Sequence, residues 1–278
     1  MMSKKDRLFQ IIRDTGPMLI AFSGGVDSSL LLAAAHEAGS PGIVAATAVS
    51  DIHPRRERHA AEGFTRERRI PHLLVPTKVT DLEVFSANRP DRCYHCKRHL
   101  FELLCRLAQE RRRYHVAHGA NLDDLNDYRP GMKAAQDFGI RAPLIEAGLG
   151  KGDVRSLARE MGLSSWEKPA MACLATRIPY GTPITTTRLN MIERAEGFLV
   201  DVGLGQCRVR HHGDLARIEL NEEDMARIMH RNVRNRIVAR LMGIGFSYVT
   251  LDLEGYISGR MNRNVDLDLI SRHKGVAS

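Results

Sequence analysis

The stretch Met18-Leu19-Ile20-Ala21-Phe22-Ser23-Gly24-Gly25-Val26-Asp27-Ser28 decides the fold of this chain. Residues 18–22 form a short apolar run that predicts a buried strand, and residues 29–38 have the pattern of a helix. The serines and glycines between them predict a loop whose N–H groups can approach phosphate oxygens at the positive end of that helix. The loop has neither the Gly-Lys-Ser/Thr of a Walker loop nor the G-x-G-x-x-G of dinucleotide sites. We therefore expect a phosphate site of another type directly after the first strand.

Strand and helix patterns alternate around this loop over about 160 residues. Apolar runs predict further strands at residues 43–49, 72–75, 114–117 and 141–145. Helical patterns lie at residues 55–69, 94–111, 132–138 and 153–161, and an amphipathic helix with Leu8, Ile11 and Ile12 on one side precedes the first strand. This alternation predicts an α/β fold with a doubly wound, mostly parallel sheet. Ligands of such a sheet bind at the carboxyl ends of its strands.

A smaller α+β domain is predicted in the C-terminal part of the chain. Residues 166–183 contain three prolines and no sustained periodicity, which is typical of a link between domains. We expect the first domain at residues 1–178 and the second at residues 184–278. The second contains a helical stripe at 192–202, a hairpin of strands 207–212 and 215–220, a helix at 222–242 and a last strand at 246–251.

The overall composition is that of a globular protein with a basic surface. The chain has 278 residues, which suits about two domains, and its formal net charge is +8. Such a charge favours anionic partners, either nucleic acid or phosphorylated small molecules. The polar start and the lack of a long apolar run predict a cytoplasmic protein without a membrane span. Five cysteines, an odd number, argue against a disulfide framework.

Three of the five cysteines are candidates for chemistry. Cys93 and Cys96 form a C-x-x-C pair at the start of a helix that we expect Asp91 to cap, where the helix dipole favours thiolates. Cys173 lies in a proline-flanked loop, so core packing does not explain it. Cys105 and Cys207 occupy apolar faces and are predicted to be packed.

These three thiols suit two kinds of metal site. Three thiolates fit an iron-sulfur cluster in which one iron has no protein ligand and can hold an exogenous sulfide. A zinc site completed by His95 or His99 stays open as an alternative.

Basic and acidic side chains beyond the loop are candidates for nucleotide contacts. Arg208 and Arg210 alternate along one strand and could bind phosphate bidentately, although a solvated polar sheet face would have the same pattern. Arg260 is a further candidate for phosphate, and Asp127 for substrate or metal. Ser50 lies at the end of the second predicted strand. It is a candidate for contact with the nucleotide, and the alternative is a loop serine without a functional role.

Several of these motifs resemble known proteins. Residues 23–28 resemble the pyrophosphate loop of the N-type ATP pyrophosphatases, the PP-loop or adenine nucleotide alpha hydrolase-like superfamily, which cleave ATP between its α and β phosphates. Together with residues 126–131, 177–181, 208–210, 216–220, 248–253 and 258–262, they resemble the LarE family of sulfur transferases over nearly the whole chain. The family makes the nickel-pincer nucleotide of lactate racemase. The implied reaction adenylates a carboxylate of pyridinium-3,5-biscarboxylic acid mononucleotide with ATP and replaces it with a thiocarboxylate.

The resemblance also implies roles for individual residues. Ser23, Gly24, Gly25 and Ser28 would hold the pyrophosphate, and Asp27 would act through Mg²⁺ or position the loop. The arginines at 208, 210 and 260 would hold the phosphate of the substrate or of AMP.

The sulfur source is where the family divides. Members that have the C-x-x-C pair carry a [4Fe-4S] cluster, here on Cys93, Cys96 and Cys173, whereas members without it sacrifice the cysteine at the position of Cys173 and leave dehydroalanine. We expect the cluster type, a sulfide donor and a homo-oligomer.

Two other classes of function remain open. A tRNA thiolase would share the loop and the thiols, but aromatic residues are only 5% of the chain and it has no RNA-binding fingerprint, so we do not expect nucleic acid as a partner. A nucleotide-binding or zinc-stabilised regulator would keep the fold without forming AMP.

Overall fold

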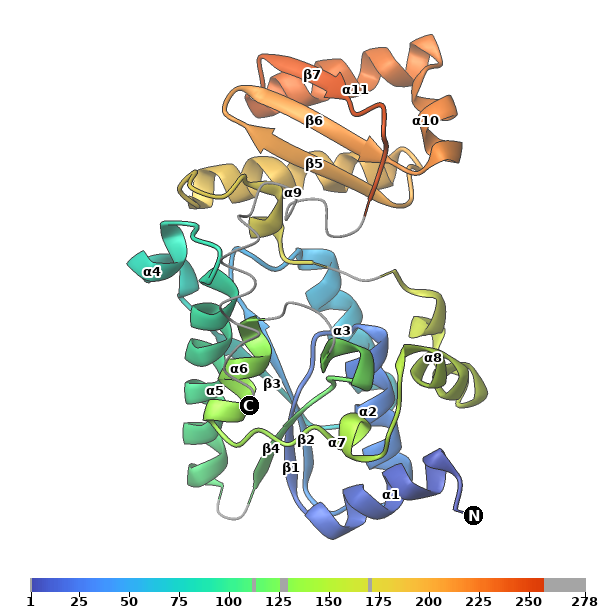
Figure 1. The fold of residues 1–278 in the computed structure, drawn as a ribbon. Coiled ribbons are helices and arrows are strands. Elements are labelled where there is room, and N and C mark those ends of the chain that lie inside the picture. The colour runs from blue at the N-terminus through green and yellow to red at the C-terminus, as the bar shows by residue number, and fades with distance from the viewer. Residues whose placement is uncertain (1, 112–113, 126–129, 170–171, 258–278) are drawn as a thin grey trace. The chain divides into compact units, whose positions relative to one another are not determined.

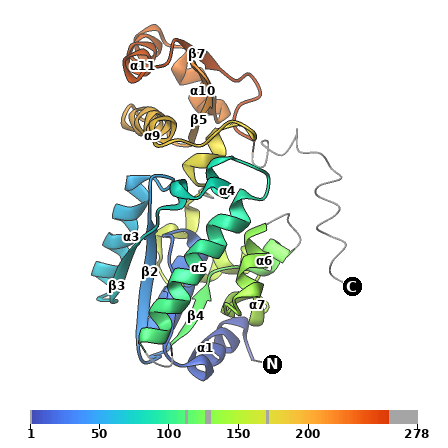
Figure 2. The ribbon, with the colours of Figure 1, turned by 90° about the vertical axis from the view of Figure 1, so that its left-hand side faces the viewer.

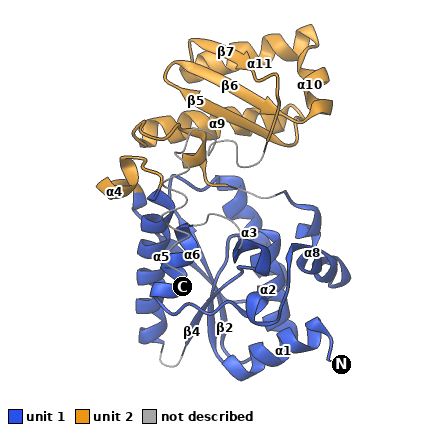
Figure 3. Cartoon of the chain, viewed as in Figure 1, with its two compact units in different colours: residues 1–79, 91–171 blue, residues 80–90, 172–278 orange. Residues whose placement is uncertain are grey.

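The structure is a computed structural model that describes residues 2–111, 114–125, 130–169 and 172–257. The chain divides into two units, coloured separately in Figure 3. Unit 1 comprises residues 1–79 and 91–171, and unit 2 comprises residues 80–90 and 172–278. The chain therefore leaves the first unit after residue 79, contributes residues 80–90 to the second, and returns to the first at residue 91. Each unit is described by itself.

The sheet of unit 1 has four parallel strands in its described residues, in the order β3-β2-β1-β4 (Figure 1). The strands are β1 (Met18–Ala21), β2 (Ile43–Val49), β3 (His72–Pro76) and β4 (His115–His118). Ala21 at the end of β1 is in register with Ala46 of β2 and with His118 of β4. This topology confirms the predicted parallel sheet, and it places the loop after β1 between two neighbouring strands.

Helices cover both faces of this sheet (Figures 1 and 2). Met18 and Ile20 of β1 bury against one layer, whereas Leu19 faces the other, because successive side chains of a strand point to opposite faces. The first layer contains α1 (Lys4–Thr15), α2 (Val26–Glu37), α3 (Arg55–Glu67) and α8 (Lys151–Glu160). The second contains α5 (Arg92–Glu110) and α6 (Pro130–Asp137). Shorter turns are η2 (Leu122–Leu125), α7 (Pro143–Glu146) and η3 (Ser164–Glu167).

Two predicted elements differ from the structure. The expected strand at residues 141–145 is reduced to a single parallel bridge between Ala117 and Arg141. Pro143 begins α7 there, because proline has no N–H to donate to a ladder and suits the first turn of a helix. The expected helix at residues 222–242 is divided into α10 (Glu222–Ile228) and α11 (Arg231–Ile244), since His230 has an extended backbone.

Unit 2 is built around a small mixed sheet. Its strands β5 (Cys207–His212) and β6 (Leu215–Leu220) are antiparallel, and β7 (Tyr248–Leu251) adds parallel to β6. Val209 and Ile218 pack against α9 (Thr186–Asp201) and α11 in one buried cluster. The unit also contains α4 (Glu83–Ser86) and η4 (Leu174–Arg177), and η1 (Val79–Asp81) leads into it. This confirms a smaller C-terminal α+β part. No described helix has the length and apolar character needed to cross a membrane.

Candidate functional site

The loop between β1 and α2 has the form of a phosphate cradle. The Ser28 hydroxyl accepts a hydrogen bond from the Ser23 N–H at 3.3 Å and donates one to the Gly25 carbonyl at 3.1 Å. Gly24 has φ +74°, a conformation that favours glycine. Gly25 is the N-cap of α2, and because glycine has no side chain, no side-chain hydrogen bond from this position caps the first N–H groups of the helix. The first N–H groups of α2 are therefore oriented as in helix N-termini that bind anions.

Asp27 in the first turn of α2 is held by two donors from other segments of unit 1. The Asn121 side-chain amide donates to Asp27 Oδ1 at 2.9 Å, and the Lys151 ammonium contacts Asp27 Oδ2 at 2.6 Å. Gly119 packs directly on this turn, because a Cβ there would lie 2.7 Å from Ser28 N and 2.8 Å from the Asp27 carbonyl carbon. The segment after β4 thus forms a wall of the loop.

Sequence reasoning missed these contacts. A further contact of the loop comes from Lys168, whose ammonium donates to the Gly24 carbonyl at 3.3 Å and pairs with the Glu57 carboxylate. Asn121 could have been found from the rule that ligands bind at the carboxyl ends of parallel strands, since it follows β4. Lys151 and Lys168 give no such signal, because their distance from the loop along the sequence exceeds 100 residues.

Two neutral histidines lie at the same edge of the sheet. The ring of His53 approaches the Ser50 hydroxyl at 3.1 Å, and His118 ends β4. Burial, with a smaller contribution from the Lys97 ammonium, lowers the pKa of both imidazoles to about 4. Ser50 therefore has a partner within its own loop, and its contact with a nucleotide stays a prediction.

None of the three candidate cysteines is in a disulfide bond, and each is partly exposed. Cys93 and Cys96 lie one turn apart at the start of α5 in unit 1, and Cys173 is the N-cap of η4 in unit 2. Asp91 occupies the N-cap position of α5 but makes no side-chain cap bond, since its Oδ2 lies 3.2 Å from His95 Nε2 instead. Within the described residues, no three His, Cys, Asp or Glu side chains are grouped to hold a metal ion.

The two remaining cysteines have the predicted packed environment. Cys105 packs against the apolar cluster between the sheet and α5. Cys207 is 3% exposed in the core of unit 2, and burial raises the pKa of its thiol to about 12. Both thiols are therefore poor nucleophiles at neutral pH.

The arginines of β5 have partners within unit 2. The Arg210 guanidinium forms two hydrogen bonds with Glu219, at 3.0 and 2.7 Å, and donates a third to the Thr176 carbonyl at 2.8 Å. Arg208 lies over the ring of Tyr256, 5.0 Å from its centroid, and burial lowers its pKa. Arg208 and Arg210 are each 5% exposed, so the solvated polar face considered as the alternative is wrong for them. Their contact with phosphate stays a prediction.

Arg217 on β6 extends this charged network. It pairs with Glu219 at 3.3 Å and with Asp252 at 3.2 Å. The predicted site residues Asp127 and Arg260 lie outside the described residues.

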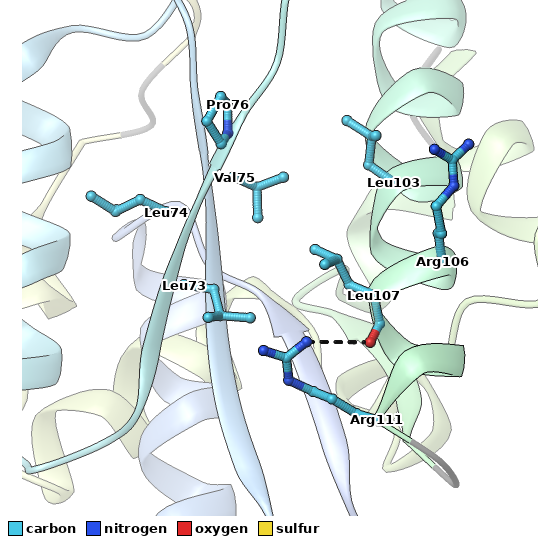
Figure 4. A pocket seen from close by; sticks show the side chains of 8 residues that line it. All are labelled: Leu73, Leu74, Val75, Pro76, Leu103, Arg106, Leu107 and Arg111. Carbon is cyan, nitrogen blue, oxygen red and sulfur yellow. Dashed lines mark hydrogen bonds between the residues drawn. The ribbon is translucent and has the colours of Figure 1, made fainter.

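A separate apolar hollow of about 300 Å³ lies between β3 and α5 (Figure 4). Figure 4 shows leucine and valine side chains of the two elements around it, with two arginines on the α5 side. Its lining is Leu73, Leu74, Val75, Pro76, Leu103, Arg106, Leu107 and Arg111. None of the candidate residues lines it, so the hollow is not part of the loop site.

Comparison with known proteins gives relatives that match nearly the full chain. No protein-family model matches it. An uncharacterized protein of Synechocystis sp. is 41% identical over 94% of this chain and 97% of its own length. An uncharacterized protein of Methanocaldococcus jannaschii is 32% identical over 87% of this chain and 91% of its own. The pyridinium-3,5-bisthiocarboxylic acid mononucleotide synthase of Lactiplantibacillus plantarum is 37% identical and covers 94% of both chains. At this identity and coverage, the chain belongs to the LarE family of ATP-dependent enzymes.

Proposed function

We propose that this protein is an ATP-dependent sulfur transferase that converts a carboxylate of pyridinium-3,5-biscarboxylic acid mononucleotide into a thiocarboxylate. The product class is the one for which the Lactiplantibacillus plantarum relative is named. The reaction would serve the biosynthesis of the nickel-pincer nucleotide. The observation that carries the proposal is the glycine loop after β1, held by Gly119, Asn121 and Lys151, in a chain so similar to that synthase.

The loop would bind the leaving pyrophosphate of ATP. Ser23, Gly24, Gly25 and Ser28 provide backbone N–H groups and hydroxyls at the positive end of α2, where phosphate oxygens are stabilised. Asp27 provides a carboxylate in the first turn of α2, and such an oxygen ligand would hold Mg²⁺. With the ion bound, the developing charge on the pyrophosphate would be neutralised.

The reaction proceeds through two substitutions. A carboxylate oxygen of the substrate attacks the α phosphorus of ATP, the bond to the β-phosphate oxygen breaks, and pyrophosphate leaves. Hydrosulfide then attacks the carbonyl carbon of the acyl adenylate, the bond to the AMP oxygen breaks, and AMP leaves with that electron pair. The thiocarboxylic acid loses its proton to solvent and becomes the thiocarboxylate. Adenylation is needed because a free carboxylate is negatively charged and has no good leaving group. Donors of the site must stabilise the negative charge that develops on the carbonyl oxygen of the tetrahedral intermediate.

The remaining polar candidates would bind the nucleotides. Arg208, Arg210 and Arg260 would hold the phosphate of the substrate or of AMP, and Ser50 and Asp127 would contact nucleotide or substrate. The two β5 guanidiniums are already fixed by Glu219 and Tyr256, so a phosphate would meet them without much loss of side-chain freedom.

The donor set of this chain fits an iron-sulfur cluster. Cys93, Cys96 and Cys173 are not in disulfide bonds and are partly exposed, in contrast to the buried Cys207, and thiolates are the ligands that such clusters take. We propose these three as ligands of a [4Fe-4S] cluster. When bound, the cluster would supply a transferable sulfide. Cys173 would then be spared rather than consumed.

The proposal is tested on protein purified without oxygen. The assay combines ATP, Mg²⁺, the biscarboxylic acid mononucleotide and sulfide, and measures AMP, pyrophosphate and the mass of the pyridinium product. We expect AMP and pyrophosphate in equal amounts with a thiocarboxylate product, and iron and sulfide content that Cys93→Ala removes. A failure to form AMP with this substrate would overturn the proposal.

The sulfur source has its own readout in this experiment. Repeated turnover with an intact Cys173 supports the cluster, whereas one turnover with dehydroalanine at position 173 overturns it in favour of sacrifice. Salt-sensitive tRNA binding with thiolation of tRNA would instead indicate the tRNA thiolase. We also propose a homo-oligomer and a separate sulfide donor, and light scattering tests the first.

A further inference from the structure

The turn that carries Cys173 is held through its backbone carbonyl. The carbonyl oxygen of Cys173 accepts hydrogen bonds from the Thr176 N–H at 3.0 Å, the Thr176 hydroxyl at 2.8 Å and the Arg177 guanidinium at 3.1 Å. The first of these is the ordinary bond of a 3₁₀ turn. The other two come from side chains, so the sequence of the turn adds specific restraints beside the cysteine.

Arg177 is the centre of these restraints. It is 0% exposed, and the same nitrogen that reaches the Cys173 carbonyl also donates to the Ala172 carbonyl at 2.8 Å. The other side of its fork forms two hydrogen bonds with Glu196 of α9, at 2.8 and 3.0 Å. Burial acts to lower the pKa of Arg177, but the nearby Glu196 carboxylate more than offsets this effect, and the pKa of Arg177 is raised overall. Arg177 therefore stays charged at every physiological pH.

The Glu196 end of this pair and the turn itself are each anchored to β5. Glu196 Oε1 also accepts from the Val209 N–H at 2.9 Å. Independently, Arg210 donates to the Thr176 carbonyl at 2.8 Å. The cysteine turn is thus joined to the β5 strand through α9 on one path and directly on the other.

A buried ion pair that holds a turn carries a large desolvation penalty in free energy. Removing two charges from water costs several kcal/mol, so such pairs contribute little net stability, but they impose a defined geometry. A guanidinium is suited to this task because its planar fork serves a carboxylate and backbone carbonyls at once, which the single ammonium of lysine cannot do. Because Glu196 accepts from one side of the Arg177 guanidinium and the carbonyls of the turn accept from the other, the Arg177 side chain is held in one orientation.

We propose that Arg177 is a positioning residue for Cys173, and that Glu196 holds it in place. Through the two carbonyls, the pair fixes the backbone from which the Cys173 thiol projects. The significance for catalysis rests on the proposed function of Cys173, but the positioning itself can be measured without it.

The test measures the alkylation rate of each cysteine by iodoacetamide in the full-length protein, followed by peptide mass spectrometry. Chelator and reductant keep all thiols free, so the result does not depend on bound metal. The variants are Arg177→Lys, which keeps the charge and loses the fork, and Glu196→Gln. Arg141→Lys is the matched control, because Arg141 makes a similar two-bond pair with Glu146 in unit 1.

We expect both variants to accelerate alkylation of Cys173 by about fivefold or more, the ratio that roughly 1 kcal/mol of lost local stability produces. Cys207, whose thiol lies 3.8 Å from the Glu196 carbonyl, should stay protected. Arg141→Lys should leave Cys173 unchanged. If Arg177→Lys does not fold, Thr176→Val removes the hydroxyl contact and should give a smaller acceleration in the same direction.

Two outcomes overturn the proposal. An unchanged Cys173 rate in the folded variants shows that the pair does not hold this backbone. A parallel rise at Cys207 shows that the pair only stabilises unit 2 as a whole. If Cys173 is accelerated alone but the wild-type protein transfers no sulfur, the positioning stands and the proposed function fails.

Discussion

At the scale of single residues, Lys151 is expected to matter for adenylation although the sequence did not single it out. Its ammonium holds Asp27 beside the phosphate loop at 2.6 Å. Lys151→Met should reduce AMP formation by about 10- to 100-fold, because the site loses both a cation and the restraint on Asp27. The rate of pyrophosphate release, measured at saturating ATP, checks this.

Lys4 provides the matched control for this prediction. Lys4 pairs with Asp153 on the same helix α8, also at 2.6 Å, and is exposed. Lys4→Met should therefore leave AMP formation and the unfolding midpoint nearly unchanged. Equal losses of activity in the two variants would contradict the assignment to Lys151.

Gly119 is a second residue whose role follows from close approach. A Cβ at this position would lie within 3 Å of backbone atoms of Asp27 and Ser28, which cannot rotate away. Gly119→Ala should push the loop out of place and weaken ATP binding by about tenfold or more, as seen by calorimetric titration. Gly63→Ala on α3 is the control, since a Cβ there would meet no neighbouring atom within 4 Å and alanine favours a helix. Unimpaired ATP binding by Gly119→Ala would show that the loop adapts.

At the scale of elements, the β5-β6 hairpin should depend on its buried charges. Glu219 is 0% exposed and binds Arg210 and Arg217 together. Glu219→Gln leaves the buried Arg210 guanidinium without its carboxylate partner, while Arg217 keeps Asp252, and should cost about 3–5 kcal/mol of unfolding free energy. The double variant Arg210→Met/Glu219→Leu removes charges from both sides and should recover part of this loss. Urea denaturation followed by circular dichroism measures both, and equal stability of the single variant and the wild type would refute the argument.

The same hairpin shows what sequence could and could not predict. Its strand bounds were predicted correctly, because alternating side chains identify each strand locally. The pairing of Arg210 with Glu219 was not, because it depends on the register in which β6 returns. For this reason the sequence leaves a solvated polar face as an alternative to a phosphate site, and the 5% exposure of each arginine excludes only the solvated face.

The phosphate loop shows the same limit at a longer range. Residues 23–28 can be predicted to bind phosphate because strand, glycines and helix follow one another directly, and the structure places this loop between β1 and α2. Asn121, Lys151 and Lys168 reach the loop only through the parallel sheet and its crossovers. The local apolar pattern at residues 141–145 also predicted a fifth strand, whereas Pro143 begins helix α7 there.

At the scale of the whole molecule, histidines whose pKa values are lowered in the fold should make both units sensitive to acid. Burial lowers the pKa of His53 and His118 in unit 1 to about 4 and lowers that of His211 in unit 2. His211 is 3% exposed, lies against Phe246, and its Nδ1 has no hydrogen-bond partner in the described residues. Protonation of any of these rings within the fold would bury a charge.

The direction of the pH effect follows from linkage. An unfolded histidine binds a proton near pH 6.5, whereas the folded His53 and His118 bind it only near pH 4 and the pKa of His211 is also lowered, so the unfolded state binds more protons below pH 6.5. The stabilisation is complete above pH 6.5 and is lost as the pH falls towards 4. We expect the thermal midpoint to fall by several degrees over this interval, since each such imidazole contributes on the order of 1 kcal/mol or more.

Substitution identifies the groups responsible. His211→Phe keeps an aromatic ring beside Phe246 but removes the titrating group, so the midpoint of this variant should depend less on pH than that of the wild type. His36→Phe, at an exposed position on α2, is the control and should keep the wild-type slope. Calorimetric scans at a series of pH values give the comparison. Identical slopes for all three proteins would mean that the acid sensitivity of the molecule originates elsewhere, because only a group whose protonation differs between the folded and unfolded states can contribute to it.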